Sequence, residues 1–124
     1  MSAATLDHVN IHTRDPAGTA RFFADLLGLT ITPGPAGLER NPWLRDGAGH
    51  PAVHIQLSER GDGAAGTGPL DHVAFRCAGY PEMLERVRAA GLPHRLNHIP
   101  DLAIRQIFVA EPNGVQIELN FYDS

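Results

Sequence analysis

Apolar and polar residues alternate along four segments of the chain, which is the pattern of β-strands with one buried face. The segments cover residues 6–12, 52–58, 70–77 and 115–121. Because successive side chains of a strand point to opposite faces, each segment predicts an apolar face toward the core and a polar face. The positions on the polar faces are His8, Asn10, His12, His54, Gln56, Ser58, His72, Arg76, Gln116, Glu118 and Asn120, together with the small residue Ala74. Histidines and amides without lysine favour a lined cavity, and a plain solvated sheet face is the alternative.

Two helices and several shorter strands complete the predicted elements. Asp15 is a suitable N-cap and Pro16 a suitable first residue for a helix that extends to about Leu27. Gly28 then suits the end of this helix, because glycine tolerates a positive φ. The other predicted elements are a helix at 81–90, with Leu84 and Val87 facing the core, and strands at 30–32, 43–45, 93–97 and 104–110.

Two landmarks recur along the chain at nearly the same spacing. Leu6-Asp7-His8-Val9 returns 64 residues later as Leu70-Asp71-His72-Val73, and the Gly-Leu pair after the first helix returns 63 residues later after the second. We therefore predict a duplicated βαβββ module and an α+β fold. Module one covers 6–58, a glycine-rich linker covers 59–69, and module two covers 70–122 of a single domain, 1–124.

Composition excludes several classes of protein. The chain has 124 residues, 43% hydrophobic residues and a net charge of −4, so it can form a core and carries no basic surface for nucleic acid. Cys77 is its single cysteine, which precludes an internal disulfide and fits a reducing compartment. No signal peptide and no apolar run of about 20 residues is present, so we expect a cytoplasmic protein without a membrane partner.

His8, His72 and Glu118 share the predicted polar face, and two of them occupy equivalent positions of the repeat. Neutral imidazole and carboxylate are good ligands for Zn, Ni, Mn, Co or Fe(II), and three such ligands leave positions open for substrate or water. A divalent metal ion would explain this choice of residues. Structural histidines are the alternative.

Four stretches of the sequence together resemble those of one known superfamily. They are Leu6-Asp7-His8-Val9, Phe22-Phe23-Ala24-Asp25-Leu26-Leu27-Gly28-Leu29, Asp71-His72-Val73-Ala74-Phe75 and Glu111-Pro112-Asn113-Gly114-Val115-Gln116-Ile117-Glu118-Leu119. They resemble the vicinal-oxygen-chelate superfamily, which includes glyoxalase I, fosfomycin-resistance proteins, extradiol dioxygenases and bleomycin-binding proteins. The resemblance implies a cupped mixed sheet of two βαβββ modules, with helices on the outer face. It also implies that His8, His72 and Glu118 hold one divalent metal.

The sequence departs from particular members of this superfamily. Glyoxalase I has a fourth ligand, a glutamate on the fourth strand, and Gln56 is expected in its place, with His54 on the same face. Fosfomycin-resistance enzymes usually carry threonine where Asn10 stands. Most extradiol dioxygenases are about twice as long as this chain. A glyoxalase-type lyase or isomerase for a small substrate with vicinal oxygens is therefore the first hypothesis. An Fe(II)-dependent extradiol-type dioxygenase and a non-catalytic antibiotic-binding resistance protein are the alternatives.

Further roles are assigned to residues of the predicted polar face and its neighbours. We expect His12 or His54 to act as a base, since imidazole titrates near neutrality, with Glu118 as a catalytic ligand. The expected substrate-binding residues are Asn10, Gln56, Arg76, Arg105, Gln106 and Asn120. His50, His94 and His98 are expected to be structural or exposed, and Cys77 to be a buried strand residue. The aromatic residues Phe22, Phe23 and Trp43 are expected in the core or an interface. Members of the superfamily are often homodimers, so a homodimer is expected.

Overall fold

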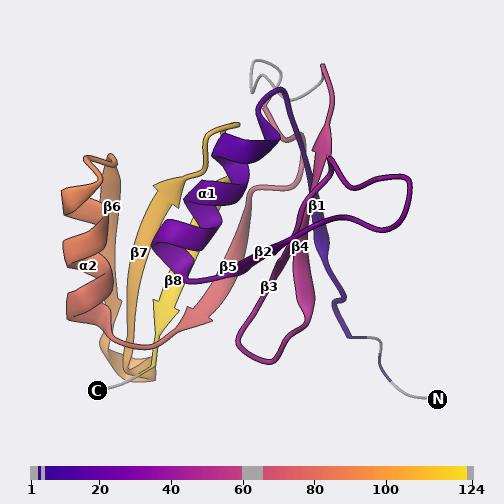
Figure 1. The fold of residues 1–124 in the computed structure, drawn as a ribbon. Coiled ribbons are helices and arrows are strands. Elements are labelled where there is room, and N and C mark those ends of the chain that lie inside the picture. The colour runs from indigo at the N-terminus through magenta and orange to yellow at the C-terminus, as the bar shows by residue number, and fades with distance from the viewer. Residues whose placement is uncertain (1–2, 4, 60–65, 123–124) are drawn as a thin grey trace. The chain divides into compact units, whose positions relative to one another are not determined.

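The computed structural model describes residues 3, 5–59 and 66–122 (Figure 1). The chain divides into two compact units, Met1–Asp62 and Gly63–Ser124, and each unit contains one of the predicted modules. Residues 60–65 of the predicted linker lie outside the described residues.

The first unit is a four-stranded mixed sheet with one helix. Its elements are β1 (Val9–Thr13), α1 (Pro16–Leu27), β2 (Thr30–Thr32), β3 (Trp43–Arg45) and β4 (Pro51–Leu57). The strands lie in the order β1-β4-β3-β2, with β1 parallel to β4 and the other pairs antiparallel. A parallel pair needs a long crossover connection, which α1 and the two strands after it provide.

The second unit repeats this topology (Figure 1). Its elements are β5 (His72–Cys77), α2 (Tyr80–Ala89), β6 (His94–Ile99), a short 3₁₀ helix (Pro100–Leu102), β7 (Ile104–Ala110) and β8 (Gln116–Phe121). The strand order is β5-β8-β7-β6, and β5 is parallel to β8. The prediction of a duplicated βαβββ module is thereby confirmed.

Local sequence explains where α1 begins and ends. The Asp15 carboxylate accepts a hydrogen bond from the backbone N–H of Gly18 at 3.0 Å, and Pro16 is the first helical residue. Gly28 ends the helix at a φ of 72°, and its N–H donates to the Ala24 carbonyl. Among the described residues, no helix has the length and apolar character needed to cross a membrane.

In each unit the core lies between the helix and one face of the sheet. Residues buried in the first unit include Phe23, Leu26, Leu44, Val53 and Ile55, and in the second unit Met83, Val87, Ile107, Leu119 and Phe121. Two details of the prediction were wrong. Met83, and not Leu84, accompanies Val87 in the core, and Leu57 at the end of β4 is 55% exposed.

Both leading strands start later than predicted, at Val9 and His72. Leu6 and Leu70 are exposed rather than packed, so no core contact extends the strands toward them. In the first unit, the Asp7 carbonyl accepts a hydrogen bond from the His50 imidazole at 2.6 Å instead of a strand partner. His50 is thus structural, as expected.

The turn between β7 and β8 is built around a buried carboxylate. Glu111 is 2% exposed, and its Oε1 accepts hydrogen bonds from the backbone N–H groups of Asn113 and Val115, both at 2.9 Å. Its Oε2 accepts from the Asn113 side-chain amide at 2.9 Å. Gly114 completes the turn with a φ of 94°. Because β8 follows directly, this turn determines the register that carries Glu118.

Candidate metal site

In the second unit, a histidine and a glutamate face each other across the parallel pair β5 and β8. His72 Nε2 lies 3.5 Å from Glu118 Oε1. His72 Nδ1 lies 2.9 Å from the Asp71 carboxylate, which can only accept, so Nδ1 carries a proton. This hydrogen bond, together with the Glu118 charge, raises the pKa of His72 although burial opposes it. The pair is therefore arranged to hold a cation, either a proton or a metal ion.

Glu118 is held from behind by a continuous chain of side-chain amides. Its Oε2 accepts a hydrogen bond from Asn120 Nδ2 at 2.8 Å, and Asn120 Oδ1 accepts one from Gln106 Nε2 at 3.0 Å. Gln106 Oε1 in turn accepts from Asn97 Nδ2 at 2.7 Å. Gln106 and Asn120 are 8% and 9% exposed. Because buried amides that are hydrogen-bonded to one another keep one geometry, this row of amides holds Glu118 with its Oε1 directed toward His72.

The first unit contains an equivalent arrangement at His8. Its Nδ1 donates to the Asp7 carboxylate at 2.6 Å, as His72 does to Asp71. This hydrogen bond lowers the pKa of Asp7. A histidine that donates its Nδ1 proton to a carboxylate leaves Nε2 free to bind a metal, and such carboxylates commonly orient metal-binding imidazoles. Both copies of the repeated motif therefore present a histidine in the same state.

Three rings stack on the polar face of the first unit. His54 lies between His8 and Trp43, with ring centroids 3.7 Å and 4.1 Å away and interplanar angles of 12° and 8°. Burial lowers the pKa of His54, and the neighbouring His8 charge lowers it further, so the ring is held neutral. Its Nε2 is buried and has no hydrogen-bond partner among the described residues. Trp43 is half-buried on this face, so it does not lie in the core, and its placement in an interface stays a prediction.

The strand registers identify the counterpart of Glu118 in the first unit as His54. Residue 10 pairs with His54 in the first sheet, as residue 74 pairs with Glu118 in the second. Since His8 and His72 each lie two residues earlier on the paired strand, the two pairs occupy equivalent positions. Our expectation that Gln56 stands at this position was therefore wrong by two residues. Alternation could not reveal the error, because residues two apart on a strand share one face. Gln56 Oε1 instead accepts a hydrogen bond from Asn10 Nδ2 at 3.3 Å.

The donor spacing in the second unit fits a divalent metal. Two donors that bind one ion at about 2.1 Å in tetrahedral geometry lie about 3.4 Å apart. The 3.5 Å between His72 Nε2 and Glu118 Oε1 matches this spacing. Within the described part of the chain, no group of three or more His, Cys, Asp or Glu side chains is placed to hold a metal ion. The set of His8, His72 and Glu118 thus stays a prediction.

The remaining predicted residues fall on both faces of the sheets. Gln106 and Asn120 share the face of Glu118, whereas Arg105 pairs with Phe121 and lies on the opposite face, toward α2. A role for Arg105 beside Glu118 is therefore wrong, because adjacent strand residues point to opposite faces. Arg76 lies on the Glu118 face, with its guanidinium 4.0 Å from the centroid of the Tyr122 ring.

His12 lies on the polar face of the first unit, in register with Gln56. Its Nδ1 is buried and has no hydrogen-bond partner among the residues that the structure describes. Its role as a base stays a prediction.

Sequence reasoning missed three contributors to the site. Asp7 and Asp71 orient the two histidines, and both were visible in the repeated Leu-Asp-His-Val motif. Asn97 is the last side chain of the amide network that holds Glu118, but a lone asparagine at the end of a predicted strand gives no such signal.

No protein-family profile and no curated protein matches the sequence. Solved structures do match along nearly its whole length. An oxidase named ChaP-H2 is 23% identical, with a TM-score of 0.72, over 97% of this chain and 94% of that one. A lactoylglutathione lyase from Agrobacterium tumefaciens is 14% identical, with a TM-score of 0.69, over 98% of this chain and 96% of that one. A glyoxalase/dioxygenase from Nostoc punctiforme is 15% identical, with a TM-score of 0.70, over 97% of this chain and 92% of that one. These likenesses confirm the predicted glyoxalase-like fold.

Proposed function

From the vicinal-oxygen-chelate fold of this chain, we propose that the protein is a divalent-metal-dependent enzyme of the glyoxalase type. Its substrate would be a small molecule with two neighbouring oxygens, which undergoes lyase or isomerase chemistry. The observation that carries the proposal is the His72–Glu118 pair, 3.5 Å apart and anchored on both sides by Asp71 and Asn120. A bound divalent ion would supply Lewis acidity to the substrate oxygens.

The proposed ligands are His8, His72 and Glu118. Asp7 and Asp71 would keep the two imidazoles in the tautomer that leaves Nε2 free, which supports metal binding. The buried amides behind Glu118 would fix its carboxylate, so that little side-chain motion is lost when the site fills.

We include His54 as a fourth donor in this proposal. Its register position is that of Glu118 in the other module, its ring is neutral, and its Nε2 has no partner among the described residues. A neutral imidazole is a suitable ligand, and a buried ring nitrogen without a partner is energetically costly. The proposed donor set is then three histidines and one glutamate, unlike that of glyoxalase I, which has a second glutamate.

Trp43 provides a direct measurement of metal binding, since it is the single tryptophan and stacks on His54. We expect Zn²⁺ or Ni²⁺ to change its fluorescence saturably in protein first treated with a chelator. Isothermal titration calorimetry should give one ion per proposed site. His72→Gln and Glu118→Gln should each weaken binding at least about tenfold, because each removes a charge-assisted or coordinate interaction.

His94→Gln is the matched control. His94 is exposed at the start of β6, and its Nδ1 is hydrogen-bonded to the Leu92 carbonyl. It should leave metal affinity unchanged. Unaltered affinity in His72→Gln would contradict the metal site. If only His54→Gln left the metal affinity unaltered, His54 would be excluded as a ligand and the other three proposed ligands would stand.

A dioxygenase is the second candidate, because the first unit has His54, and no carboxylate, at the position equivalent to Glu118. Two histidines and one carboxylate with open positions are the ligand set of non-haem Fe(II) oxygenases. One of the matching structures carries the name glyoxalase/dioxygenase. Iron in protein purified without added metal, with oxygen uptake on catechols, would support this candidate. Zn, Ni or Mn without oxygen uptake would support the lyase or isomerase.

We also propose that the protein is a homodimer. The proposed donors come from both units, so a site could be completed by two chains. Light scattering coupled to gel filtration measures the mass. Mixing His8→Gln with His72→Gln protein should restore part of the metal binding if chains share sites, and separate sites would show no recovery.

A further inference from the structure

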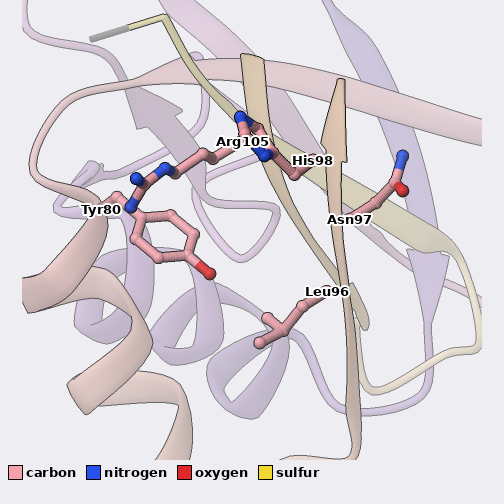
Figure 2. Close-up of a pocket in the computed structure, with 5 residues that line it drawn as sticks. All are labelled: Tyr80, Leu96, Asn97, His98 and Arg105. Carbon is pink, nitrogen blue, oxygen red and sulfur yellow. The ribbon is translucent and has the colours of Figure 1, made fainter. Parts of the chain in front are cut away.

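A pocket of about 310 Å³ lies in the second unit, lined by Tyr80, Leu96, Asn97, His98 and Arg105 (Figure 2). We infer that it binds a small organic anion, namely a carboxylate joined to an apolar group. The inference is separate from the proposed metal function, because the pocket lies on the other face of the same sheet.

Strand register places the pocket on the face of α2. His98 pairs directly with Arg105, and Leu96 pairs with the buried Ile107. Asn97 lies between them on β6, and its side chain points to the opposite face, where it donates to Gln106. Figure 2 shows the Arg105 and His98 side chains at one side of the pocket, Leu96 at the other, and Tyr80 beside both.

The charge of the pocket is uncompensated. The Arg105 guanidinium lies 5.4 Å from the centroid of the Tyr80 ring, and it forms no ion pair with a carboxylate of the described residues. Its cross-strand neighbour, His98, adds an imidazole N–H that can donate a hydrogen bond to an anion. The whole chain has a net charge of −4, so the uncompensated charge of Arg105 is a local feature.

The other side of the pocket is apolar. Leu96 is 42% exposed, and the Tyr80 ring packs edge-on against Phe121 at a centroid distance of 5.4 Å, which fixes its position. A ligand with an apolar group would cover Leu96 while its anionic end met Arg105. The volume is at the lower end of the range for small-molecule pockets, about 300–1,000 Å³.

The duplicated fold provides an internal comparison. An equivalent pocket in the first unit lies between α1 and β2, with a volume of about 390 Å³. Its charged lining residues are Arg21, Arg40 and one carboxylate, Glu39. Both units therefore have a pocket between the helix and the edge strand, as a result of the shared fold. Only the pocket of the second unit has an arginine without a carboxylate in its lining, and anion binding would explain this difference.

An NMR titration of the full chain with benzoate tests the inference, in the presence of EDTA so that no metal participates. We expect saturable shifts confined to the amides of Tyr80, Leu96, His98 and Arg105. Arg105→Gln should weaken benzoate binding about tenfold or more, because a charged hydrogen bond is lost. Arg105→Lys should give an intermediate loss, since it keeps the charge and loses the planar fork.

Arg95→Gln is the matched control, because Arg95 also lies on β6, but it stacks on Phe108 at 4.0 Å on the other face. It changes the net charge equally and should leave benzoate affinity within about twofold. Equal weakening in the two glutamine variants, or no saturable shift in the unaltered protein, would overturn the inference. Acetate binding as tight as benzoate would overturn the apolar part. His72→Gln should bind benzoate normally, which separates this outcome from the metal proposal.

Discussion

Replacing Glu111 by alanine should destabilise the protein strongly, because this buried carboxylate is the acceptor for two backbone N–H groups. Both hydrogen bonds, from Asn113 and Val115, measure 2.9 Å, and the side chain is 2% exposed. An orphaned buried N–H costs about 1–3 kcal/mol. Since Asn113 and Val115 are only half-buried, water can partly replace the carboxylate. We expect a loss of about 2–4 kcal/mol in the free energy of unfolding.

Glu111→Gln separates the acceptor from the charge. A glutamine can keep its amide oxygen toward both N–H groups, and the Asn113 amide can turn so that its oxygen accepts from the new NH₂ group. The expected loss is therefore about 1 kcal/mol, from the weaker neutral hydrogen bonds. Glu85→Ala, at an exposed position of α2, serves as the control and should change stability by less than about 0.5 kcal/mol.

Urea denaturation followed by circular dichroism measures these differences by linear extrapolation. The order of stability should be unaltered protein and Glu85→Ala, then Glu111→Gln, then Glu111→Ala. Equal losses in both Glu111 variants would mean that the charge, and not the acceptor geometry, matters. A loss in Glu111→Ala no larger than in Glu85→Ala would refute the reasoning.

Three further predictions concern the site, the thiol and the core. Asp71→Asn should lower Zn²⁺ affinity about 10–100-fold in calorimetry, because it loosens the orientation of His72; a change below about twofold would argue against the role of Asp71. Burial raises the pKa of Cys77, so native protein should react with a disulfide reagent more slowly than urea-unfolded protein. Because only the unfolded thiol then ionises, stability should fall as pH rises above about 8.5, and Cys77→Ala should lack this dependence. Leu119→Ala, at a fully buried position, should cost about 2–5 kcal/mol in urea denaturation, and exposed Leu102→Ala less than about 0.5.

Much of the fold could be predicted because local signals and the repeat agreed. Asp15, Pro16 and Gly28 determine the ends of α1 through caps that involve only neighbouring residues. Alternation identified the faces of β1, β4, β5 and β8, since a strand with one buried face has a period of two. The starts of β1 and β5 were placed too early, because whether an exposed leucine joins a strand depends on its partner strand.

The site could be predicted only as far as the face of each strand. Alternation placed His54 and Gln56 on one face and could not distinguish them, because they lie one period apart. Their register with β1 decides between them, and this register depends on pairing between residues 44 positions apart, such as Asn10 and His54. A similar limit applies to Arg105 and Gln106. Because they are adjacent on one strand, one of them had to share the face of Glu118, but the sequence did not indicate which one.

Duplication explains why the two units share a framework but differ in chemistry. The Asp-His pair is kept in both modules, at 2.6 Å and 2.9 Å, and each histidine faces the same position of the neighbouring parallel strand. At that position one module has neutral His54 and the other has Glu118, held by buried amides. In the metal site that we propose, one imidazole and one carboxylate at these two positions would contribute a charge of −1, where two carboxylates would contribute −2. The bound metal ion would then keep more of its positive charge and be a stronger Lewis acid toward substrate oxygens.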